Sequence, residues 1–208
     1  MLWPFNHFRK PRLAPRGTIE AIYGMIVTQA REPLFYRDLG VPDTVNGRFD
    51  LVLLHLWLAL RRLKSVGSGT VLSQALFDHF CSDMDDNLRE MGVGDQSVPK
   101  RMRAFGEAFY GRTAAYDMAL SEGSEAFAAA LCKNVLDGAD LEKARQLAAY
   151  AEAAMADLAQ IDDATLLGGE RGRQQLAVLH DVGEDAGHIR ETGIGMGQHV
   201  ARPQQVED

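Results

Sequence analysis

The chain has 208 residues, of which 46% are hydrophobic and 25% charged, and its net charge is -7. These totals are ordinary for a soluble globular protein and allow one domain with a sizeable core, or at most two small domains. The acidic balance argues against a nucleic-acid binder, because neutralising phosphates needs an excess of Lys and Arg.

Residues 1–17 are predicted to form a basic N-terminal arm, in which apolar residues precede the cations Arg9, Lys10, Arg12 and Arg16. The segment has no unbroken apolar run and no small-residue cleavage site, so it is not a secretory signal. Basic residues beside Trp and Phe can lie at an anionic membrane surface. A disordered arm is the alternative, because three prolines oppose a helix.

Residues 18–167 are predicted to form a single all-α domain of about six helices, since no strand pattern or internal repeat is present. The first helix should run from about Thr18, its N-cap, to Arg31. The connection after Pro33 contains turn residues, but Phe35 and Val41 are among the apolar residues that should pack it on the core.

The segment from Phe49 to Leu63 is predicted to be the buried central helix. From Leu51 to Leu60 every residue except His55 is apolar, so a helix here would be hydrophobic on all sides and must be surrounded by partners. The run is too short to cross a bilayer, which needs about 20 apolar residues.

The later helices follow from periodicity and capping residues. They are expected at about 71–91, from Ser97 to about 120, at about 125–136, and after Asp140. The last of these has a narrow seam of small and flexible residues that would allow close helix packing: Leu141, Ala144, Ala148, Ala151, Met155 and Leu158. A short turn is expected at 163–167.

Residues 168–208 are predicted to form a flexible, glycine-rich tail, since eight of the 20 glycines fall between Gly168 and Gly197. Its histidines lack the spacing of metal ligands. Cys81 and Cys132 also lack such spacing and are expected to be reduced core residues of a cytosolic protein.

Two patterns suggest chemistry. Asp83 and Asp86 could hold magnesium for isoprenoid diphosphate chemistry, but a second facing acidic cluster is missing, so a solvated acidic face is the preferred interpretation. His55 could ligate haem iron, although a lone His on an apolar helix is more often a core residue satisfied by one hydrogen bond. We therefore expect no metal, no cofactor and no catalytic residues.

The strongest polar cluster lies on the helix after Ser97, with Glu107, Tyr110, Arg112 and Tyr116 at spacings of three and four that put each pair on one side. Arg and Tyr at such positions are typical interface anchors. The alternative is an intramolecular network with Arg61, Arg62 or Arg89. The predicted binding surface comprises Arg61, Arg62, Arg89, Glu107, Tyr110, Arg112 and Tyr116.

Several ordered motifs within residues 19–167 together resemble the ubiquinol-cytochrome c chaperone family. They are Phe35-Tyr36, Gly40-Val41-Pro42-Asp43-Thr44, Gly47-Arg48-Phe49-Asp50, Leu54-His55-Leu56-Trp57, Arg61-Arg62-Leu63, Leu88-Arg89-Glu90-Met91-Gly92-Val93-Gly94-Asp95, Glu107-Ala108-Phe109-Tyr110-Gly111-Arg112 and Ala115-Tyr116.

The resemblance implies an all-α, non-enzymatic assembly factor for the respiratory cytochrome bc complex. Mitochondrial members act on newly made cytochrome b, work with a small partner protein and associate with the ribosome. The chain lacks their long N-terminal extension and any transit peptide, so it is expected to be a bacterial member. Its location is expected to be cytoplasmic, or peripheral at the inner face of the cytoplasmic membrane.

Overall fold

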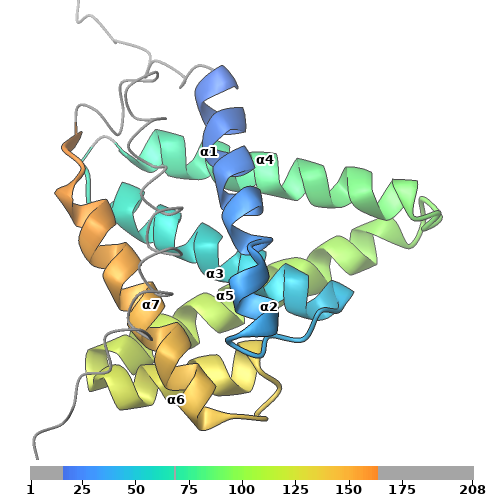
Figure 1. Ribbon diagram of the computed structural model, residues 1–208. Coiled ribbons are helices and arrows are strands. Elements are labelled where there is room, and N and C mark those ends of the chain that lie inside the picture. The colour runs from blue at the N-terminus through green and yellow to red at the C-terminus, as the bar shows by residue number, and fades with distance from the viewer. Residues whose placement is uncertain (1–15, 68, 164–208) are drawn as a thin grey trace, which may run out of the picture.

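Helix α3, Val45–Lys64, is the element on which the other helices pack (Figure 1). The computed structural model describes residues 16–67 and 69–163, and within these ranges it contains seven helices and no strand. The all-α prediction is therefore confirmed. The other six helices are α1 Arg16–Ala30, α2 Pro33–Arg37, α4 Gly69–Glu90, α5 Val98–Glu122, α6 Ser124–Val135 and α7 Leu141–Gln160.

The composition of α3 explains its central position. Nine of the ten residues from Leu51 to Leu60 are buried, and only Val52 is half-buried. Helices α1, α4, α5, α6 and α7 all contact α3, as a helix that is apolar on every side requires. The Thr44 hydroxyl accepts a hydrogen bond from the Gly47 amide at 3.2 Å, so the helix begins before the expected Phe49.

The connection between α1 and α3 contains the short helix α2, which the sequence did not predict. It packs on the core as expected, because Phe35, Leu39 and Val41 are buried. The ring of Phe35 lies edge-on to His55 and Tyr150, with centroids 5.3 and 5.0 Å apart. This segment thereby joins α3 to α7.

Helices α4 and α5 form a hairpin whose tip projects away from the other helices (Figure 1). Leu88 and Val98 are both buried, but neither belongs to the main hydrophobic cluster, so the tip has a small core of its own. Gly92, at φ +79°, follows α4, and the Val93 amide donates to the Leu88 carbonyl at 3.0 Å. This bond is typical of a Schellman cap.

Helices α6 and α7 pack against each other through the predicted seam of small residues. Ala144, Ala148 and Ala151 are buried, whereas Leu141, which was included in the seam, remains exposed. The Asp140 carboxylate accepts from the Lys143 amide at 3.0 Å and caps α7 as predicted.

Other boundaries differ from the expectations. Helix α1 begins at Arg16, so Thr18 lies inside it rather than at its cap, and Ser97 makes no side-chain capping bond to α5. Residues 1–15 of the N-terminal arm, the last four residues of the 163–167 turn and the tail from 168 lie outside the described ranges. No helix within these ranges is long and apolar enough to span a membrane.

The entry to α3 provides a test of this packing. A Cβ at Gly47 would lie 2.0 Å from the Pro42 carbonyl oxygen, whereas a Cβ at Gly24 would meet nothing within 4 Å. We expect Gly47→Ala to lower the free energy of unfolding by about 2 kcal/mol or more. Gly24→Ala should raise it by about 0.5–1 kcal/mol through helix propensity. Urea unfolding of both variants measures this, and equal effects would contradict the close approach at Gly47.

Candidate interaction surface

The outward face of α5 carries an exposed strip that we call the outer α5 strip, formed by Glu107, Tyr110, Ala114 and Met118. Spacings of three and four place these residues on one side of the helix. Tyr110 is 62% exposed and Met118 is 64% exposed, which makes them two of the most exposed large hydrophobic residues in the described ranges. Within the part of the chain that the structure describes, Glu107 has no ion-pair partner.

Tyr110 is supported from below by other aromatic residues. Its ring centroid lies 6.0 Å from that of Phe77 on α4 and 5.5 Å from that of Phe109. Phe77 and Phe109 are themselves 4.9 Å apart and pack near Phe80. The tyrosine is therefore the exposed end of a packed aromatic cluster, which limits its rotation before a partner binds.

Arg112 and Tyr116 lie on the inward side of α5, so the prediction that Tyr116 belongs to the surface is wrong. Tyr116 has 0% exposure, and its ring lies edge-on to Trp57 at 5.3 Å and to Phe127 at 6.2 Å. An Arg112 nitrogen lies 2.7 Å from an oxygen of buried Asp50. The two residues do share a side, but that side packs on α3 and α6.

Arg61, Arg62 and Arg89 are each held by contacts within the chain. Arg61 pairs with Asp117 of α5, which confirms an intramolecular link between this helix and Arg61. Arg62 donates to the Leu158 carbonyl at 2.8 Å near the end of α7. Among the described residues, no ion pair or hydrogen bond connects Arg62 to α5. Of the seven predicted residues, the structure thus brings only Glu107 and Tyr110 together on an open face.

Arg89 forms salt bridges within the α4–α5 hairpin and is not part of the outer α5 strip. Its guanidinium is 2.6 Å from Asp85, one turn earlier, and it also pairs with Asp95 in the tip. Both pairs are exposed, and such pairs stabilise a fold only weakly. Arg89 therefore helps to order the tip.

His55 is a fully buried core residue, and both of its ring nitrogens have partners. Nδ1 lies 2.7 Å from the Leu51 carbonyl, so it carries the proton, and Nε2 lies 2.8 Å from the Tyr150 hydroxyl, from which it accepts. Gln29 donates to the same hydroxyl at 3.2 Å. The haem hypothesis is not supported for this histidine, which makes two hydrogen bonds rather than the expected one.

The aspartates of α4 also have protein partners. Asp83 accepts from the Tyr23 hydroxyl at 2.7 Å and from the Asn87 amide at 3.1 Å. No group of three or more His, Cys, Asp or Glu side chains within the described ranges is arranged to hold a metal ion. The magnesium hypothesis for Asp83 and Asp86 is therefore not supported.

The sequence match that decides the family covers residues 37–172, and its model describes a ubiquinol-cytochrome C chaperone. This range is more than half of the chain. The chain belongs to the ubiquinol-cytochrome c chaperone family.

Relatives within this chaperone family include ubiquinol-cytochrome-c reductase complex assembly factor 1 of Xenopus laevis, 29% identical over 104 residues, which are 50% of this chain and 52% of that protein. The human protein is 32% identical over 98 residues, 47% of this chain and 33% of that protein. The chain thus spans about half or less of these relatives. The crystal structure of the Cbp3 homolog from Brucella abortus has 39% identity and a TM-score of 0.66, and the match covers 74% of this chain and 86% of that one.

Three of the motifs that carry the chaperone-family resemblance meet where α3 begins and packs on α5. Thr44 and Gly47 shape the entry to α3. Asp50, three residues later, reaches Arg112 of the motif on α5. Sequence analysis missed this role of Asp50, although an acid just before a long apolar run is a signal of a buried partner. The motifs therefore secure α5 on α3 and leave the outer α5 strip free.

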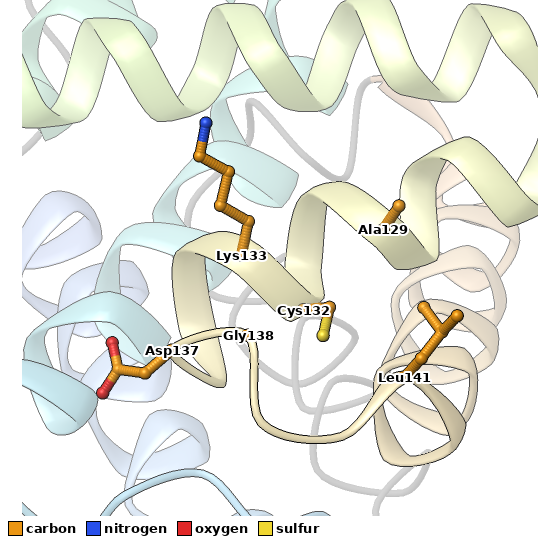
Figure 2. Close-up of a pocket in the computed structure, with 6 residues that line it drawn as sticks. All are labelled: Ala129, Cys132, Lys133, Asp137, Gly138 and Leu141. Carbon is orange, nitrogen blue, oxygen red and sulfur yellow. The ribbon is translucent and has the colours of Figure 1, made fainter.

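A surface hollow of about 510 Å³ lies where α6 passes into α7 (Figure 2). Its lining includes Cys132, Lys133 and Asp137, but the Lys133 side chain extends toward a neighbouring helix and Asp137 points elsewhere. A small-molecule site normally has polar groups that converge. These do not, so the hollow lacks the arrangement of a small-molecule site.

Two buried groups of α3 should have opposite effects on stability as the pH changes. Burial raises the pKa of Asp50 from 3.8 to about 6, with Arg112 reducing the rise, and burial lowers the pKa of His55 from 6.5 to about 4. The contribution of Asp50 is fully present below pH 3.8 and is lost as the pH rises through 6. That of His55 is present above pH 6.5 and lost as the pH falls through 4.

Between pH 4 and 6.5 the two shifts act in opposite directions, so the free energy of unfolding of the wild type should change less with pH than that of a variant that lacks one of the two groups. In Asp50→Asn, stability should rise with pH across this window, since only His55 remains. In His55→Gln, stability should fall as the pH rises across this window, since only Asp50 remains. Urea unfolding at several pH values measures the slopes, and equal slopes in the two variants would refute the assignment.

Proposed function

We propose that this protein is an assembly factor for ubiquinol-cytochrome c reductase and that it acts by binding, without catalysis. The family match and the relatives named as assembly factors of that complex support this function. The observation that carries the proposal is the outer α5 strip, an apolar surface with a supported aromatic residue on an element that is firmly anchored at its other side.

The strip has the chemistry needed to hold a segment of a membrane-protein subunit, which we take to be newly made cytochrome b. Such a segment exposes apolar helix faces before assembly, and covering them gains about 25 cal/mol per Å². Gly111 and Ala114 are small and exposed beside Tyr110 and Met118, so a client helix can approach α5 closely. The thioether of Met118 adapts to differently shaped clients.

The proposed setting is the cytoplasmic side of the bacterial membrane, where the subunit is inserted. A small assembly partner would bind elsewhere on the domain, and the basic arm at 1–17 would add contact with the membrane surface. This part of the proposal rests on the family resemblance and on the sequence of the arm.

The strip can be tested in cells that lack this gene and carry variants of it. Tyr110→Ser with Met118→Ser should lower the cytochrome b absorbance and the ubiquinol-cytochrome c reductase activity of membranes. Loss of both side chains should weaken client binding at least tenfold, because exposed aromatic and thioether anchors contribute about 1–2 kcal/mol each.

Val45→Ser with Leu141→Ser is the matched control, because it removes two other exposed apolar side chains from different helices. The control should restore normal spectra. Both double variants should stay folded, and the strip variant should melt slightly lower because Tyr110 contacts Phe77 and Phe109. Arg112→Ala with Tyr116→Ala should instead lower the melting temperature, because it removes core contacts. Equal activity of the strip variant and the control would remove the outer α5 strip from the proposal.

A further inference from the structure

The hairpin tip carries cations that the proposed function does not use. Lys100, Arg101 and Arg103 lie in the first two turns of α5, and all three are exposed. None has an ion-pair partner among the residues that the structure describes. No acid lies between Asp95 and Glu107. We call Lys100, Arg101 and Arg103 the tip cations.

Their position is unfavourable for the helix itself. The first turns of a helix have the positive end of the macrodipole, which favours acids and opposes cations. Arg89 at the end of α4 is by contrast paired with Asp85 and Asp95. The tip cations therefore contribute nothing evident to the fold and group three unpaired positive charges on the α5 side of the tip, on a chain whose net charge is -7.

Apolar side chains lie at the same end of the hairpin as the tip cations. Met91, immediately after α4, is 63% exposed, and Val93 is half-buried beside it. The tip projects from the body (Figure 1) and is supported by its own small core of Leu88 and Val98. It is a convex, ordered end that carries both cations and exposed apolar groups.

We propose that the hairpin tip docks on an anionic phospholipid surface. The tip cations would approach the lipid phosphates while Met91 enters the boundary between head groups and acyl chains. A nucleic acid fits less well, because its phosphate backbone offers no apolar layer to the exposed Met91. An acidic peptide would need a groove, whereas the tip is convex.

Vesicle co-sedimentation of the full chain tests this directly. Binding should occur to vesicles of phosphatidylglycerol and phosphatidylcholine but not to phosphatidylcholine alone, and it should decrease as salt rises. Each cation near such a surface contributes about fivefold in affinity, so Lys100→Gln, Arg101→Gln and Arg103→Gln together should weaken binding by about 100-fold. Met91→Ser should weaken it severalfold.

The matched control is Arg31→Gln, Lys64→Gln and Lys133→Gln, which makes the same change in net charge at exposed positions elsewhere. It should leave binding near the wild-type level. The tip changes should weaken binding by a similar factor in a full chain whose Arg9, Lys10 and Arg12 are also changed to Gln, because the arm and the tip would contribute separately. Equal losses in the tip and control variants, or unchanged binding of the tip variant, would overturn the proposal. Loss of binding to RNA but not to vesicles in the tip variant would assign the tip to a nucleic acid instead.

This inference does not depend on the client. The vesicle assay contains no cytochrome b, so the tip proposal can fail while the outer α5 strip still binds its client. Conversely, the tip variant is expected to melt like the wild type, because the tip cations make no contacts that hold the fold.

Discussion

The enclosure of α3 is the constraint on which the rest of the structure depends. A helix that is apolar on all sides has to be covered on all sides, and α1, α4, α5, α6 and α7 provide that cover. The one histidine in the run makes the arrangement specific, because an unpaired imidazole would be costly there. Its bond to Leu51 lies within α3, its bond to Tyr150 holds α7, and Gln29 extends the same chain of bonds to α1.

The two halves of α5 make different contacts. Its later half is held by Asp50, which pairs with Arg112, and by Asp117, which accepts from Trp57 at 3.2 Å and pairs with Arg61. Its first half extends from the body and packs on α4 through Phe77 and Phe109, and Phe105 also lies against Phe49 of α3, with ring centroids 4.9 Å apart. Because polar contacts with α3 fix the inward face, the outward face is free to present apolar side chains without loosening the fold.

The features that the sequence predicted well are those that depend on composition along one helix. The burial of α3, the cap at Asp140 and the alanine face of α7 are local properties. Helix α2 was missed because five residues are too few to show a helical period, and Pro33 at its start was interpreted only as the end of the preceding helix.

The error at Tyr116 has a different cause. Periodicity places Arg112 and Tyr116 on one side of the helix, but it does not show whether that side faces solvent. The charge of Arg112 favoured the interpretation that it does. The deciding partner, Asp50, lies far away in the sequence. The same limit explains why Met118 was not placed with Tyr110, although their spacing fits one face.

The two proposed surfaces are parts of one helical face. Lys100, Arg103, Glu107, Tyr110, Ala114 and Met118 follow each other at spacings of three and four along the outward side of α5. At 1.5 Å per residue, Arg103 and Tyr110 are separated by about 10 Å along the axis. Because α5 is one continuous helix, a tip held at lipid head groups would set both the distance and the direction of the apolar strip relative to the membrane. A client segment leaving the bilayer would then meet the strip after a short path, which limits the exposure of its apolar surface to water.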